Sequence, residues 1–171
     1  MKVLTQSQVN FYNEKGYILV DNVLSKEEIK ELSDVTDTFV EKSRSVTENN
    51  EDFVLEPEHT AENPKLRRLK SPEHQHKVYE NALTNKNILD IVEDLIGPNI
   101  RSHGSKLNMK APGGGSSVEW HTDWGFYPHT NDDILEVGIP LDDMEIENSK
   151  ENVIPKYTAE RQNEKNDNYF N

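Results

Sequence analysis

The chain has 171 residues, of which 33% are apolar and 30% are charged, and its formal net charge is -13. A chain of this length can form one domain with a real core. Its acidity argues against nucleic acid and anionic lipid as partners, because both attract basic surfaces. The chain has no cysteine, which excludes disulfides and thiolate metal sites, so any metal must be held by His, Asp or Glu.

The first residues of the chain contain no apolar run of signal-peptide length. No stretch of the sequence approaches the roughly 20 apolar residues that a membrane-spanning helix needs. We therefore expect a cytoplasmic protein with no membrane partner.

The front of the chain predicts a short helix followed by a strand. Thr5 and Gln8 form a Thr-x-x-Gln capping box, and the helix that follows it is expected to end near Gly16. Residues 17–20 are a short apolar run and are predicted to form a buried strand.

Two longer helices are predicted from their start and stop signals. Ser25 and Glu28 form a second capping box, and apolar residues at helical spacing behind it predict an amphipathic helix over residues 26–42. Residues 87–96 have an apolar face, and Gly97 follows them, which is typical of a helix end.

The segment between these two helices is predicted to be irregular. Residues 43–64 have no periodicity and are rich in Glu, Asn, Ser and Thr, so we expect a long loop or an insertion. A basic cluster follows, and the simplest interpretation of such a charge run is a solvated turn without a functional role. The cluster consists of Lys65, Arg67, Arg68 and Lys70.

Extended segments follow the last predicted helix. Strands are expected over residues 100–109, 117–123 and 134–141, with a further strand start near residue 153. Helices first and strands afterwards indicate the α+β class with an antiparallel β core. Residues 1–143 are expected to form the domain, and residues 144–171 a polar tail.

His121 and Asp123 are the candidate metal ligands. They stand two residues apart in a predicted strand, where alternation places both side chains on one face. With one more histidine they would complete the two-His-one-carboxylate triad that leaves open positions on Fe(II). A hydrogen-bonded surface pair is the alternative, because so short a motif also arises by chance.

The sequence around this pair resembles the phytanoyl-CoA dioxygenase family. Lys110-Ala111-Pro112-Gly113-Gly114-Gly115 matches the Lys-x-Pro turn and Gly-rich bend of that family, and Trp120-His121-Thr122-Asp123 matches its Trp-His-x-Asp motif. Gly97-Pro98-Asn99-Ile100 is also similar, and the likeness extends over about residues 5–143. The family consists of oxygenases that depend on non-haem Fe(II) and use 2-oxoglutarate as co-substrate.

The resemblance implies a fold and a set of site residues. The fold would be a double-stranded β-helix, or jelly-roll, with helices packed outside it, and here it would be incomplete. His121 and Asp123 would be the first two iron ligands. Other residues are candidates for contact with 2-oxoglutarate or for lining the pocket, although a structural role is the alternative for each. They are Lys70, Lys106, Lys110 and Trp124.

The end of the sequence departs from the family. The resemblance implies a later iron-binding histidine and an arginine that pairs with 2-oxoglutarate. After His129 the sequence contains no histidine, and Arg161 is its only later arginine. We therefore expect a chain that is truncated relative to the family and that has little or no turnover by itself.

Three functions stay open from the sequence. The first is a dioxygenase that hydroxylates a C–H bond of a small organic substrate as part of a longer parent protein. The second is a non-catalytic remnant or a binding-only jelly-roll protein. The third is a cupin-type metal-binding protein in which His103 or His129 supplies the third ligand.

Overall fold

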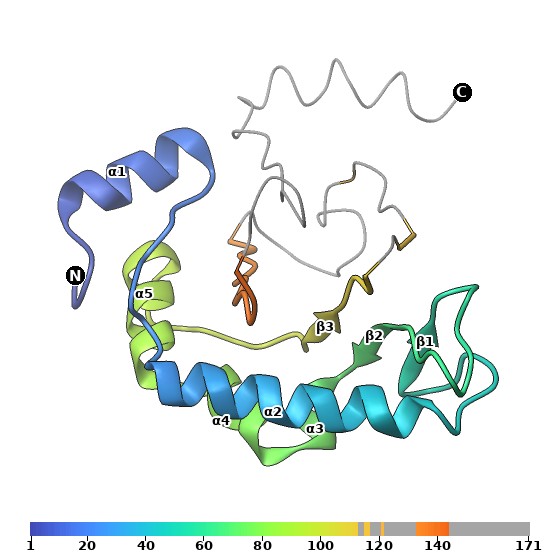
Figure 1. Ribbon diagram of the computed structural model, residues 1–171. Coiled ribbons are helices and arrows are strands. Elements are labelled where there is room, and N and C mark those ends of the chain that lie inside the picture. The colour runs from blue at the N-terminus through green and yellow to red at the C-terminus, as the bar shows by residue number, and fades with distance from the viewer. Residues whose placement is uncertain (113–114, 117–120, 122–132, 144–171) are drawn as a thin grey trace, which may run out of the picture.

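The structure is a computed structural model that describes residues 1–112, 115, 116, 121 and 133–143. The described part is a mixed α+β arrangement in which the long helix α2 runs beneath a small antiparallel sheet (Figure 1). In chain order its elements are α1 (Gln6–Lys15), α2 (Lys26–Ser43), β1 (Phe53–Leu55), β2 (Leu66–Lys70), α3 (Pro72–Gln75), α4 (Lys77–Leu83), α5 (Lys86–Ile96) and β3 (Lys106–Asn108). None of the helices in the described ranges is long and apolar enough to cross a membrane.

The predicted helices are confirmed, and the capping boxes that predicted two of them are formed. At the start of α1, the Thr5 amide donates to the Gln8 side chain at 2.9 Å, and the Gln8 amide donates to the Thr5 hydroxyl at 3.3 Å. Ser25 and Glu28 make the same exchange at the start of α2. Gly16 ends α1 in the left-handed region, with φ 81°, where glycine has no steric penalty.

The basic cluster is the central strand of the sheet, so its interpretation as a solvated turn is wrong. The strand order is β1-β2-β3, and both pairs are antiparallel. A β-bulge interrupts the β1–β2 pairing, since Val54 pairs with Arg68 but Leu55 pairs with Leu66. The extra residue lets Leu66 and Leu69, three positions apart, both reach the core.

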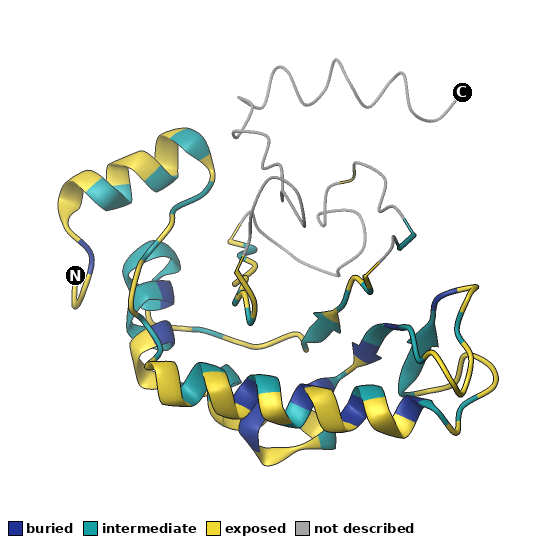
Figure 2. Ribbon diagram, viewed as in Figure 1, coloured by how far each residue is buried: buried dark blue, intermediate teal, exposed yellow. Residues whose placement is uncertain are grey.

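One apolar cluster forms the core between α2, β2 and α4 (Figure 2). Leu69, in the centre of the sheet, is completely buried, and its strand neighbours Phe53 and Leu107 pack partly buried beside it. The Tyr79 hydroxyl forms a buried 2.9 Å hydrogen bond with the Thr36 hydroxyl, which itself donates to a backbone carbonyl of α2. The buried members of the cluster are Leu32, Phe39, Leu66, Leu69, Val78 and Tyr79.

Two predicted strands are wrong and one is shortened. Residues 17–20 are extended but belong to no sheet, and Leu19 is 84% exposed. Residues 133–143 have no regular secondary structure, and only Lys106–Asn108 of the predicted strand 100–109 pairs with a neighbour. An apolar run forms a strand only where a partner offers backbone hydrogen bonds. The predicted strand 117–123, except for His121, and the predicted tail 144–171 lie outside the described residues.

The predicted loop 43–64 contains β1 and is tied down at several points, so its description as an irregular insertion is wrong in part. The Asn50 side chain accepts hydrogen bonds from the amides of Asp52 and Phe53 and so shapes the turn that starts β1. Arg44, at the end of α2, donates to the carbonyls of Ala61 and Glu62 at 2.8 and 3.1 Å. The segment is therefore built onto α2 and β2 through its backbone.

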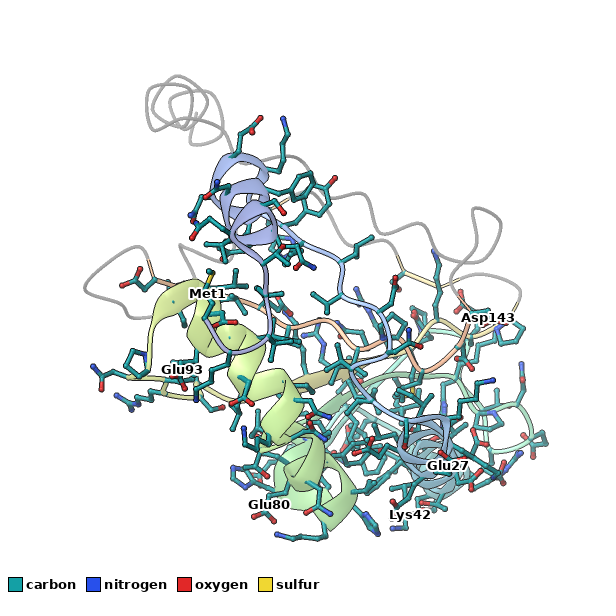
Figure 3. All side chains as sticks on the ribbon, turned by 90° about the vertical axis from the view of Figure 1, so that its left-hand side faces the viewer. Met1, Glu27, Lys42, Glu80, Glu93 and Asp143 are labelled. Atoms are coloured by element: carbon teal, nitrogen blue, oxygen red, sulfur yellow. The ribbon has the colours of Figure 1, made fainter. Side chains whose placement is uncertain are left out.

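The N-terminal segment is attached to α5 through acidic side chains, chiefly that of Asp94. Asp94, whose side chain is 3% exposed, accepts hydrogen bonds from the amides of Lys2, Val3 and Leu4 at 2.6 to 2.9 Å. The Lys2 ammonium adds an ion pair with Glu93 at 2.6 Å, and Figure 3 shows Met1 beside α5. Leu4 of this segment is 5% exposed, whereas helix α1, which follows, has no fully buried residue. Polar contacts and the burial of Leu4 therefore both fix this end of the chain.

Candidate metal centre

His121 is the predicted metal ligand that the described residues include. Its side chain is exposed. Asp123 and Trp124 lie outside the described residues, so the shared face of His121 and Asp123 stays a prediction. Within residues 1–112, 115, 116, 121 and 133–143, no group of three His, Asp or Glu side chains is placed to hold a metal ion.

The chain that leads to His121 is fixed to the sheet by Glu56, a residue that the sequence interpretation missed. Glu56 follows β1 directly, and it is only 3% exposed. Both of its carboxylate oxygens lie 3.1 Å from the Ser116 amide, and the Ser116 hydroxyl donates to Oε2 at 2.6 Å. The hydrogen bond from this hydroxyl lowers the pKa of Glu56 below its ordinary value of 4.5.

Gly115, next to Ser116, is closely packed against the same carboxylate. A Cβ atom at this position would lie 3.1 Å from Glu56 Oε1 and 3.2 Å from Cγ of Lys110. Both distances are tighter than ordinary van der Waals contact, so glycine lets the backbone approach Glu56 here. The Gly-rich bend of the motif is therefore the place where the chain meets the sheet.

A second Gly-Ser dipeptide meets a second glutamate at the other end of β3. The Ser105 hydroxyl donates to Oε2 of Glu73, which belongs to α3 and has a side chain that is 7% exposed. A Cβ atom on Gly104 would lie 3.7 Å from Oε1 of the same glutamate. Two glutamates of the scaffold with little-exposed side chains thus hold the segment that contains β3, one on each side of the strand.

The structure brings two of the predicted co-substrate residues together. Lys70 and Lys106 are directly opposite each other in the β2–β3 pair, and opposed residues of a ladder share a face of the sheet. The Lys70 ammonium donates to the Asn50 carbonyl at 2.9 Å, and the Lys106 ammonium pairs with Glu136 at 3.2 Å. This face of the sheet therefore carries two neighbouring positive charges, on the side opposite to Leu69 and the core.

The third lysine and the described histidines have other surroundings. Lys110 is exposed and packs its stem against Gly115. His103, a predicted alternative ligand, is exposed ahead of β3, and His129 lies outside the described residues. His59 is used structurally, since its Nδ1 accepts the Lys65 amide at 2.9 Å.

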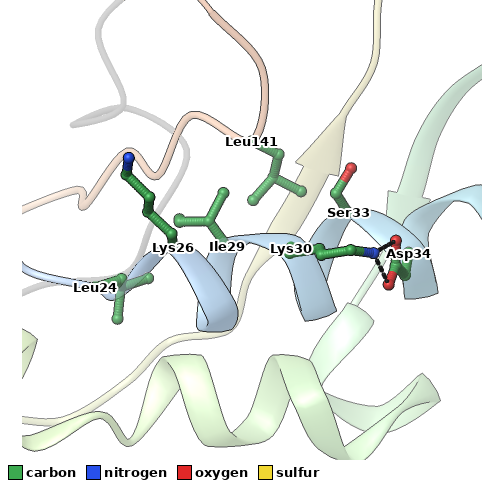
Figure 4. Close-up of a pocket in the computed structure, with 7 residues that line it drawn as sticks. All are labelled: Leu24, Lys26, Ile29, Lys30, Ser33, Asp34 and Leu141. Carbon is green, nitrogen blue, oxygen red and sulfur yellow. Dashed lines mark hydrogen bonds and ion pairs between the residues drawn. The ribbon is translucent and has the colours of Figure 1, made fainter.

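Residues 133–143 are placed by a groove on α2 (Figure 4). The groove has a volume of about 340 Å³, and Leu24, Ile29 and Leu141 are among the residues that line it. At its end the Lys30 ammonium bridges to both carboxylate oxygens of Asp34, at 2.7 and 2.6 Å. The segment is attached to the rest of the protein by Leu141, which packs against the apolar core, and by Glu136, which pairs with Lys106 of β3.

Comparison with known proteins gives a consistent picture. Residues 12–157 match the model of the phytanoyl-CoA dioxygenase (PhyH) family. A "probable alpha-ketoglutarate-dependent hypophosphite dioxygenase" from Stutzerimonas stutzeri is 33% identical over 144 residues, which are 84% of this chain and 50% of that protein. The chain therefore spans about half the length of this relative.

A solved structure shares the fold. The crystal structure of EctD from S. alaskensis with bound Fe superposes with a TM-score of 0.61 at 21% sequence identity. The match covers 71% of this chain and 41% of that protein. The mixed α+β arrangement with a small antiparallel sheet is therefore the fold seen in part of an iron-containing protein.

Proposed function

This chain belongs to the phytanoyl-CoA dioxygenase family, and we propose that it forms the iron-binding part of an Fe(II)- and 2-oxoglutarate-dependent dioxygenase. The observation that carries the proposal is the family match over residues 12–157, which spans both His121 and Asp123. The name of the Stutzerimonas stutzeri relative supports 2-oxoglutarate as co-substrate, and the iron in the EctD structure supports the metal.

The donor set fits Fe(II). An imidazole and a carboxylate are ligands that non-haem Fe(II) takes in oxygenases, and the sequence has no thiolate that would favour a softer metal. In the proposal, His121 and Asp123 hold the ion from one short segment of the chain. With iron and 2-oxoglutarate bound, the site would supply oxidation by O2, in which one oxygen atom goes into the succinate formed when the oxo acid loses CO2 and the other goes to the substrate.

Lys70 and Lys106 are the proposed binding site for the co-substrate. At neutral pH 2-oxoglutarate is a dianion, and two adjacent ammonium groups attract it. Lys70 and Lys106 are directly opposed on the sheet and carry such charges. We assign them the task of orienting the co-substrate, with Lys110 close to the Gly-rich bend and Trp124 as a wall of the pocket. We also propose that β1–β3 are part of a double-stranded β-helix.

The substrate in the proposal is a small molecule that offers a bond for hydroxylation. Hypophosphite is the first compound to assay, because the Stutzerimonas stutzeri relative is named for it. Small organic molecules with an activated C–H bond are the second group.

Release of succinate in the presence of Fe(II), ascorbate and 2-oxoglutarate tests the proposal. We expect a low rate from these 171 residues, because only two protein ligands are assigned, and a fall to background in His121→Ala and Asp123→Ala. Release that is equal in the parent and in both variants would contradict the proposal. Iron binding without any succinate would favour the binding-only alternative.

A further inference from the structure

We propose that Glu56 is a positioning residue for the metal centre, acting through Ser116 on the chain that leads to His121. The inference rests on the proposed function of His121 and Asp123 as metal ligands. It adds a residue that lies 65 positions before His121 in the sequence and that belongs to no part of the motif.

The Glu56 carboxylate depends on its hydrogen bonds with Ser116. A carboxylate that is 3% exposed has lost nearly all of its water, and an ionised group in that position needs good hydrogen bonds in return. Ser116 supplies two donors, its amide and its hydroxyl, and the hydroxyl contact at 2.6 Å has the length of a charge-assisted bond. Moving Ser116 away would leave the carboxylate buried without these partners.

The anchor is itself firmly held. The Glu56 amide donates to the Lys65 carbonyl at 2.9 Å, and the Glu56 carbonyl accepts the His59 amide at 3.0 Å. The amide of Leu55, the residue before it, donates to the Asn49 side chain at 2.8 Å. Glu56 therefore transmits the position of the β1–β2 pair to Ser116 rather than following the movements of a loose loop.

The residue that Glu56 holds is close along the chain to the first proposed ligand. Ser116 is five residues from His121, so even a fully extended chain separates their Cα atoms by no more than about 18 Å. Gly115 lies against the same carboxylate, so two successive residues are held. Groups that orient metal ligands from outside the ligand set commonly change metal affinity by about 10- to 100-fold when they are removed.

The chain offers a matched control in Glu73. Its contact with Ser105 repeats the chemistry of the Glu56–Ser116 contact, with a buried glutamate, a serine hydroxyl and a preceding glycine. Ser105 is on the far side of β3, 16 residues before His121. A purely structural role predicts the same consequences for both glutamates, whereas a positioning role predicts a difference between them.

The experiment is a titration with Co(II), a visible substitute for Fe(II), together with thermal melting of every variant. We expect Glu56→Gln to weaken Co(II) binding roughly tenfold, because one of the two Ser116 donors then faces an amide nitrogen. Glu73→Gln is expected to lower the melting temperature to a similar extent and to leave Co(II) affinity within about twofold. Ser116→Ala is expected to weaken binding by about threefold, and the double variant Glu56→Gln/Ser116→Ala no more than Glu56→Gln alone.

The His121→Ala variant distinguishes failure of the proposed role of Glu56 from failure of the proposed metal centre. If it abolishes Co(II) binding while Glu56→Gln and Glu73→Gln bind equally well, the role of Glu56 is overturned and the metal centre stands. If it leaves Co(II) binding unchanged, the metal centre and the role of Glu56 are both overturned. If Glu56→Gln does not fold, Ser116→Ala decides, and unchanged affinity in that variant overturns the inference.

Discussion

The core of the protein and the segments attached to it are held by different forces. The core between α2, β2 and α4 consists of apolar side chains around the fully buried Leu69. Three of the segments attached to it are in addition held by a carboxylate. Asp94 holds the N-terminal residues, Glu73 holds Ser105, and Glu56 holds Ser116 on the way to His121.

This difference indicates which parts of the protein respond to pH and to single substitutions. Apolar burial does not depend on pH, whereas a carboxylate that accepts hydrogen bonds loses acceptor capacity when it is protonated. The chain that carries the proposed metal ligands is attached in the second way. Acid and single substitutions are therefore expected to release it while the core stays folded.

The largest expected effect comes from a cavity in the core. Leu69→Ala removes the one completely buried leucine of the sheet, and we expect it to lower the free energy of unfolding by about 3 kcal/mol. Urea unfolding followed by circular dichroism measures this. Leu19→Ala, at a residue that is 84% exposed, is the control and is expected to change stability by less than about 0.5 kcal/mol. Equal effects would show that the assigned core does not carry the stability.

An acid titration is expected to separate the attached segments from the core. Backbone amides, that of Val3 first, lower the pKa of Asp94 from 3.8 to about 2, and Ser116 lowers the pKa of Glu56. A lowered pKa means that the contact stabilises the folded protein above the ordinary pKa. This contribution is lost as the pH falls through the lowered value. The amides of residues 2–4 are therefore expected to lose their protection between about pH 4 and pH 2.

Amide signals in NMR spectra follow this release residue by residue. Helix α2 is expected to keep its protection at pH values where residues 2–4 have lost theirs, and Asp94→Asn is expected to remove the acid transition of residues 2–4. Loss of both regions in one step would show that the attachments and the core form a single cooperative unit.

The smallest expected effect concerns a polar contact inside the apolar core. Tyr79→Phe removes the hydroxyl that is hydrogen-bonded to Thr36 and leaves the ring in place. We expect a loss of about 1 kcal/mol in the free energy of unfolding, the usual net contribution of one such bond. Urea unfolding measures it, and a loss as large as that of Leu69→Ala would contradict the division between apolar and polar forces.

Local signals predicted α1, α2 and α5, because caps and helical spacing act within a few residues, whereas the short helices α3 and α4 were not predicted. Thr5 with Gln8 and Ser25 with Glu28 form the boxes that their spacing predicts. Strands β1 and β2 were missed because a bulge places Leu66 and Leu69 on one face, and this removes the alternation that identifies a strand. Strands were predicted at 17–20 and 134–141 from apolar runs that have no sheet partner there.

The candidate site shows the same limit. His121 and Asp123 were identified by their motif, and the pairing of Lys70 with Lys106 follows from strand register, which spacing along the chain does not reveal. Glu56 was missed because it stands in a polar segment among other acidic residues, and only contact with Ser116, sixty positions later, distinguishes it. Long-range contacts of this kind leave no periodic trace in one sequence.

Equilibrium binding of Fe(II) without oxygen tests the central claim most directly, namely that His121 and Asp123 hold the iron. We expect the parent chain to bind one equivalent, and His121→Ala and Asp123→Ala each to weaken binding by more than about tenfold. His74→Ala, at an exposed histidine of α3, is expected to bind as the parent does. Fe(II) affinity that is the same in the parent, His121→Ala and Asp123→Ala would contradict the account.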